Sequence, residues 1–183
     1  MSLKERAGYY YAVLDKGCAE AILLAANEVY DLGLTETDAA LFAGFRTGMG
    51  CGSTCGGLAG AIGVLSKKYG QREDLKELCA GFVEAFSLKL ACGATDCSTL
   101  AARYKTEASR CRTAVELTAE ALEEFIDKLD NRTAGSTGEG CTLRPEDIKR
   151  VKAMGFLHHK GTNKFNGRII TRNGRITNEE RQT

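Results

Sequence analysis

Apolar residues recur at helical spacing through most of the first 130 residues, which predicts a bundle of α-helices. The strongest stripe runs from Arg72 to Leu90, and another begins at Cys18 and stops before Gly33. Further helical stretches are expected at residues 3–14, 35–45 and 53–69, in a short piece at 100–104, and in a last long helix over 111–129. We therefore expect an all-α fold with five to seven helices in residues 1–130.

The helical pattern ends at residues 131–140, where small and polar residues predict a flexible linker. Beyond it, residues 141–183 are expected to form a basic extension. Pro145 opens a short helix that reaches Met154, and residues 168–177 read as a β-hairpin around Asn173-Gly174. A lone hairpin is marginal in water, so this one needs something to pack on.

Two thiols lie in the most glycine-dense run of the chain, residues 48–60. Glycine permits tight turns, so this run can present Cys51 and Cys55 closely to a small partner. Ser53 or Thr54 is expected to cap the following helix, which puts Cys55 in its first turn, where backbone amides favour a thiolate. A lowered thiol pKa gives reactivity or metal ligation. We therefore predict Cys51 and Cys55 as catalytic; the alternative is that both are small buried residues between helices.

The cysteine count narrows the class of chemistry. No apolar stretch approaches the length of a membrane span, and the charged first residues are not followed by a long apolar run. A cytoplasmic protein without a membrane partner is therefore expected. Eight cysteines in a reducing compartment do not form a static disulfide framework. Metal ligation or redox chemistry is the better expectation.

Charge is divided unevenly along the chain. Residues 1–140 carry 15 Lys and Arg against 20 Asp and Glu, whereas residues 141–183 carry 10 against 4. We expect the basic tail to dock a redox partner protein. Nucleic acid is not expected, because clustered basic residues are more often a solvated surface. The run Tyr9-Tyr10-Tyr11 is expected in the core or at a homodimer surface.

Helix order predicts where the thiols meet. Consecutive helices joined by short loops usually run antiparallel, so the second, fourth and last helices should point the same way. Their starts, together with the turn after the fifth helix, bring six thiols to one pole: Cys18, Cys51, Cys55, Cys92, Cys97 and Cys111. This argument counts residues 97–104 as a turn. Cys79 is expected in the core, and Cys141 lies beyond the linker.

The cysteine pattern of the first 130 residues resembles that of the C-GCAxxG-C-C family of redox-active proteins. Cys18, within Gly17-Cys18-Ala19-Glu20, matches the first cysteine of the pattern. Cys97 and Cys111 are similar to the third and fourth.

The middle motif matches less well. Counted from Cys55, Gly56 replaces the alanine and Ala59 the final glycine of the family motif. We take Cys55 as the motif cysteine and Cys51 as an additional thiol.

The resemblance implies redox activity. An iron–sulfur centre is implied by the related C-terminal region of split-Soret cytochromes, with Cys18, Cys55, Cys97 and Cys111 as the metal and cofactor ligands and two-iron two-sulfur as the cluster. No Cys-x-x-Cys-His motif occurs, so covalent heme is not expected. The tail resembles the opening of the ferredoxin-like half domain of siroheme sulfite and nitrite reductases, but lacks the later elements that hold their cofactors. We interpret it as an interaction module.

Two other functions fit the same thiols. A metal-free oxidoreductase would cycle two close cysteines between dithiol and disulfide. Structural zinc also accepts four cysteine ligands, although only Cys51 and Cys55 have about the expected spacing. The leading hypothesis is a cluster protein that transfers electrons or senses redox state.

Overall fold

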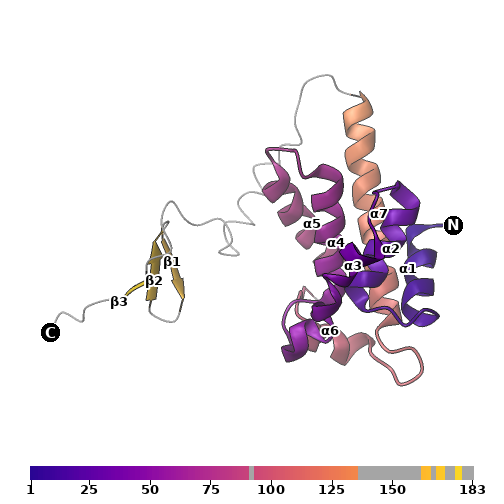
Figure 1. The fold of residues 1–183 in the computed structure, drawn as a ribbon, viewed down its shortest axis with the longest axis horizontal. Helices are drawn as coiled ribbons and strands as arrows, with labels where there is room; N and C mark the ends of the chain where they lie inside the picture. Colours follow the sequence, from indigo (N-terminus) through magenta and orange to yellow (C-terminus); the bar gives the residue numbers. More distant parts are fainter. Residues whose placement is uncertain (91–92, 136–161, 166–167, 172–175, 179–183) are drawn as a thin grey trace. The chain divides into compact units, whose positions relative to one another are not determined.

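The computed structural model describes residues 1–90, 93–135, 162–165, 168–171 and 176–178. Its helical part confirms the predicted all-α bundle (Figure 1). The elements of this part are α1 (Leu3–Ala12), α2 (Cys18–Tyr30), α3 (Glu36–Ala40), η1 (Ala43–Phe45), η2 (Gly48–Gly52), α4 (Gly56–Tyr69), α5 (Leu75–Lys89), α6 (Cys97–Tyr104) and α7 (Arg112–Gly135). Within the described residues, no helix combines the length and apolarity needed to cross a membrane.

One apolar core lies between the long helices. The apolar stripes of α2, α5 and α7 face inward, and Ile22, Phe82 and Leu122 are completely buried. α7 packs against α1 and α5, while α2 packs against α1 and α4 (Figure 1). Burying one such side chain contributes about 1.5–3 kcal/mol to folding. The apolar stripe of each helix therefore determines which face packs into the core.

The contact between α2 and α4 is unusually close. A Cβ at Gly60 would lie 2.6 Å from the carbonyl oxygen of Ala19 and 2.8 Å from its Cα. Only glycine fits there without moving the backbone of α2. The sequence comparison aligned Ala59 with the final glycine of the family motif. The glycine that this packing requires is the next residue, Gly60. The close approach places the starts of α2 and α4 side by side.

Helix α4 begins later than predicted. Its N-cap is Cys55, not Ser53 or Thr54, so Cys55 precedes the first turn. The reason is a short backbone ladder with the segment before α6. The amide of Cys97 donates to the carbonyl of Ser53, and the amide of Cys55 donates to the carbonyl of Thr95, at 2.5 and 2.9 Å. Thr54 is bridged to Asp96 by this pairing, so residues 53 and 54 stay outside the helix.

The helix predicted for residues 35–45 is also divided. Thr35 and Asp38 form the predicted capping box, and α3 starts there. The amide of Phe42 then bonds to the carbonyl of Ala39 at 3.0 Å, and the amide of Phe45 bonds to that of Phe42 at 3.0 Å. These three-residue spacings tighten the chain into the 3-10 turn η1.

The chain divides into two compact units, Met1–Cys141 and Thr142–Thr183. α7 continues to Gly135, so the first residues of the predicted linker 131–140 are helical. In the second unit, β1 (Thr162–Phe165), β2 (Arg168–Thr171) and β3 (Ile176–Asn178) form an antiparallel sheet in that order. β2 and β3 flank the predicted Asn-Gly turn, and β1 is an additional strand. The helix predicted from Pro145 to Met154 lies outside the described residues.

Candidate functional site

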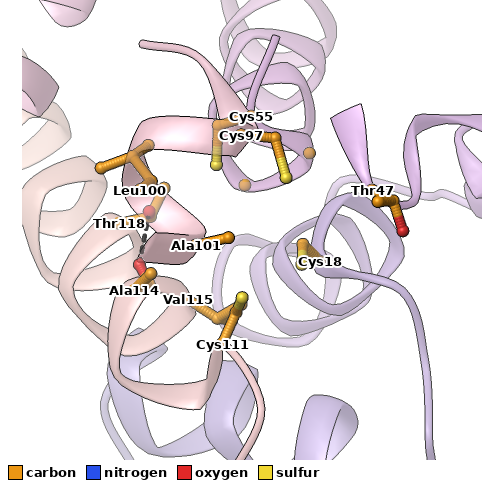
Figure 2. A pocket seen from close by; sticks show the side chains of 12 residues that line it. Cys18, Thr47, Cys55, Cys97, Leu100, Ala101, Cys111, Ala114, Val115 and Thr118 are labelled. Carbon is orange, nitrogen blue, oxygen red and sulfur yellow. Dashed lines mark hydrogen bonds between the residues drawn. The ribbon is translucent and has the colours of Figure 1, made fainter. Parts of the chain in front are cut away.

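Four thiols from distant parts of the chain line one cavity of about 20 Å³ in the helical unit. They belong to Cys18, Cys55, Cys97 and Cys111, and Figure 2 shows their sulfur atoms around a common space. All four are free thiols; Cys55 is buried and the other three are half-buried. The cavity has room for about one or two water molecules. The structure thus brings together four of the six cysteines that the sequence predicted to converge.

Each of these thiols stands at the start of a helix. Cys18 and Cys97 are the first residues of α2 and α6, Cys55 caps α4, and Cys111 immediately precedes α7. The first amides of a helix lack partners within the helix, and the helix dipole adds positive potential there. Negative charge at the cavity is therefore favoured by four helix starts.

Helix α6 begins earlier than predicted. The sequence analysis expected a short helical piece at 100–104 and placed Cys97 in the turn before it. The structure starts the helix at Cys97, with Asp96 as its cap, whose carboxylate accepts the Thr99 amide at 2.8 Å. Cys97 therefore lies at the cavity, as predicted, but as a helix N-terminal residue rather than a turn residue.

Burial controls the protonation of the free thiols. Loss of solvent, together with the smaller effect of the neighbouring Cys55, raises the pKa of Cys18 to about 12. Burial also raises the pKa of Cys55, against the lowering effect of the Leu58 and Gly57 amides. Neither amide makes a hydrogen bond of ordinary capping geometry to the Cys55 sulfur. The predicted low pKa of Cys55 is therefore wrong for the free thiol, because desolvation outweighs the helix start.

The rest of the cavity wall is mainly apolar. Leu100 and Ala101 come from α6, and Ala114 and Val115 come from α7 (Figure 2). The hydroxyl of Thr118 donates to the carbonyl of Ala114 at 2.7 Å, so its proton is already used. No carboxylate or imidazole is among the residues described as lining the cavity. The donor set is thus essentially sulfur.

The thiols are gathered but not arranged as metal ligands. Among the described residues, no three Cys, His, Asp or Glu side chains are placed so that they could hold a metal ion. A bound metal or cluster would require the four sulfurs to move. Sulfur ligands suit iron–sulfur clusters and zinc, so the chemistry of this donor set fits either group.

Cys51 lies outside the cavity. It is exposed, and its sulfur donates to the carbonyl of Gly48 at 3.4 Å. Residues 47–50 all have positive φ, which gives a left-handed turn. A Cβ at Gly48 would lie 2.6 Å from the Cβ of Cys97, so the glycine lets this turn pack onto the cavity thiol. The turn presents Cys51 to solvent, and its catalytic role stays a prediction.

The other cysteines are also separate from the cavity or cannot be placed. Cys79 is half-buried within α5, packs against the core and does not line the cavity, as its mid-helix position predicted. Cys92 and Cys141 lie outside the described residues.

Two polar groups that sequence reasoning missed support the site. The Tyr11 hydroxyl accepts the amide of Cys111 at 3.1 Å. The buried carboxylate of Glu20 accepts the amide of Gly17 at 2.9 Å and faces Arg46 at 3.4 Å, which fixes the start of α2. Tyr11 could have been found, because it follows Leu3 and Ala7 at four-residue steps on the buried face of α1.

Comparison with known families agrees with this grouping. The family model described as "Putative redox-active protein (C_GCAxxG_C_C)" matches residues 17–125. The chain belongs to this family. All four cavity cysteines fall within the matched residues, as the C_GCAxxG_C_C pattern requires. Membership supports a redox role for the protein. Neither the curated proteins nor the solved structures gave a match.

The exposure difference predicts an order of thiol reactivity in metal-free, reduced protein. At about pH 8, Cys51 should be alkylated by iodoacetamide before Cys18 and Cys55. The pKa of Cys18 is raised from 9.0 to about 12, which lowers its thiolate fraction about a thousandfold relative to an ordinary thiol. Peptide mapping by mass spectrometry over time gives the order. Labelling of Cys18 as fast as Cys51 would contradict the closed cavity.

Proposed function

We propose that Cys18, Cys55, Cys97 and Cys111 bind one two-iron two-sulfur cluster and that the protein transfers electrons or senses redox state. The observation that carries this proposal is the meeting of four thiols, each at a helix start, around one small cavity. Cysteine thiolates are the usual ligands of iron–sulfur clusters. The cluster would supply a site that accepts and releases one electron.

The surroundings of the four thiols support a bound metal group rather than thiolates without a metal. Burial keeps the pKa of each of the four thiols above its ordinary value, so they are protonated when no metal is present. Metal binding replaces these protons, and the four helix starts then offset the negative charge of the ligands. The apolar wall of the cavity limits access of water.

The chain's own residues hold and orient the ligands. Gly60 lets α2 and α4 approach, which sets Cys18 beside Cys55. The contact of Glu20 with Gly17 and Arg46 fixes the first turn of α2. We further propose a cytoplasmic protein that exchanges electrons with a redox partner protein through the basic residues 141–183.

A metal-free dithiol function is favoured by one observation. Cys55 is the thiol that most strongly affects the pKa of Cys18, and both are free. Oxidation of this pair would form one disulfide and release two protons, with two electrons passing to an external oxidant. Such a protein would be colourless and would contain no sulfide.

Metal analysis of the full chain separates these functions. Protein produced and purified without oxygen should be coloured and contain about two irons and two sulfides per chain. One zinc per chain without sulfide would instead indicate a structural metal. Protein that holds no metal but gains a disulfide on mild oxidation would indicate the dithiol function. Cys79→Ser is the matched control, because Cys79 is a half-buried thiol outside the cavity. The Cys79→Ser protein should have the same colour as the wild type.

A further inference from the structure

The hydroxyl of Tyr11 lies beside Cys111, one of the four cysteines of the site. Tyr11 comes from α1, is only 6% exposed, and belongs to the buried core. Its hydroxyl oxygen accepts the amide of Cys111 at 3.1 Å. Interaction with this hydroxyl lowers the pKa of the Cys18 and Cys111 thiols, against the larger raising effect of burial.

The hydrogen-bonding capacity of a phenol shows what this hydroxyl can do. It has one proton to donate and two lone pairs to accept. The amide of Cys111 uses one lone pair, so the proton remains for a sulfur of Cys18 or Cys111. The pKa of an ordinary phenol, about 10, lies well above neutral pH. The hydroxyl therefore keeps its proton and acts as a donor to sulfur.

Arg110 holds the ring in this position. Its guanidinium lies over the Tyr11 ring, 4.6 Å from the centroid, and donates to the backbone carbonyl of Tyr11 at 2.9 Å. Asp15 pairs with the same guanidinium at 2.7 Å. The ring is thus fixed on one face by a cation, while its hydroxyl end reaches Cys111. A residue fixed in this way can orient the sulfurs that it contacts.

We propose that Tyr11 is a positioning residue of the redox centre, which donates a hydrogen bond to the sulfur of Cys18 or Cys111 and raises the reduction potential of the centre. This inference rests on the proposed function of the four cysteines. Reduction adds one electron, and the extra negative charge is shared by the ligand sulfurs. A hydrogen bond to such a sulfur stabilises the reduced state more than the oxidised state. The proton stays on Tyr11 throughout.

The test compares Tyr11→Phe with Tyr10→Phe in the full chain. Both variants remove one phenolic hydroxyl from α1 and keep the ring. The Tyr10 hydroxyl bonds to Glu28, away from the thiols. Midpoint potentials are measured by anaerobic optical titration of the loaded proteins, and melting is measured on the metal-free forms. Tyr11→Phe should have a lower midpoint potential than wild type, whereas Tyr10→Phe should match wild type.

Each other outcome also decides the question. A Tyr11→Phe protein with an unchanged potential would overturn the inference, and so would one whose metal-free form melts far below wild type, because the hydroxyl would then serve the fold. Normal melting with loss of the centre, beside a loaded Tyr10→Phe, would support it. If wild type holds no cluster, the proposed function fails separately, and the same shift is sought in the potential of its dithiol–disulfide couple.

Discussion

Replacement of Cys55 by serine is expected to abolish the redox centre. Cys55 is the most buried of the four cavity thiols, caps α4 and lies within the residues that match the family model. A serine oxygen is a harder and less acidic ligand than sulfur, so it is a poor substitute on an iron–sulfur cluster. Iron, sulfide and visible absorbance of anaerobically purified Cys55→Ser should fall to the level of a protein without a cluster.

Cys51→Ser provides the control for this result, since Cys51 is exposed on the neighbouring turn and does not line the cavity. It should retain the iron, sulfide and absorbance of the wild type. Full cluster occupancy in Cys55→Ser would remove the central assignment. Loss of the cluster in Cys51→Ser alone would show that the exposed thiol, not the buried one, is the ligand.

Replacement of Gly60 by alanine is expected to destabilise the helical unit by about 1–3 kcal/mol, the usual cost of overpacking. The new Cβ would meet the backbone of Ala19 at 2.6 Å, and a helix backbone cannot rotate away as a side chain can. α2 and α4 must then separate, which also moves Cys18 away from Cys55. Thermal and urea unfolding followed by circular dichroism measure the loss, and cluster occupancy should fall as well.

Gly44→Ala is the matched control, because a Cβ at Gly44 meets no atom within 4 Å and its φ is not positive. Its unfolding free energy should stay within about 0.5 kcal/mol of wild type, as for other surface changes. Equal stability of Gly60→Ala and wild type would mean that the two helices do not pack as closely as the structure shows.

Much of the bundle was predictable because its apolar stripes are regular and its helix starts are marked. Cys18 and Cys111 head the stripes of α2 and α7, and the glycine run precedes α4, so alternation of helix direction brought three of the four thiols to one pole. These signals are local. They locate where an element begins and which face it buries, which is what amphipathic periodicity encodes.

Other parts of the site depended on contacts between segments that are distant in sequence. The ladder of Ser53 with Cys97 delays the start of α4 and aligns α6, and no local pattern announces such pairing. The pKa of Cys55 was predicted with the wrong sign because a sequence shows a helix start but not the depth of burial. Tyr11 lay within a tyrosine run whose three members look alike, although only its position on α1 faces the thiols.

The position of Tyr11 also shows that the working unit is longer than its recognisable part. The family match begins at residue 17, yet α1 ends before it and contributes the hydroxyl that accepts the amide of Cys111. α1 is fastened to α7 along its length, through the ion pair of Lys4 with Glu120 at 2.8 Å and the buried side chains of Leu3 and Ala7. Trimming a chain of this kind to its matched residues would leave the cysteine pattern complete but remove the helix that packs on α7 and holds the Cys111 amide.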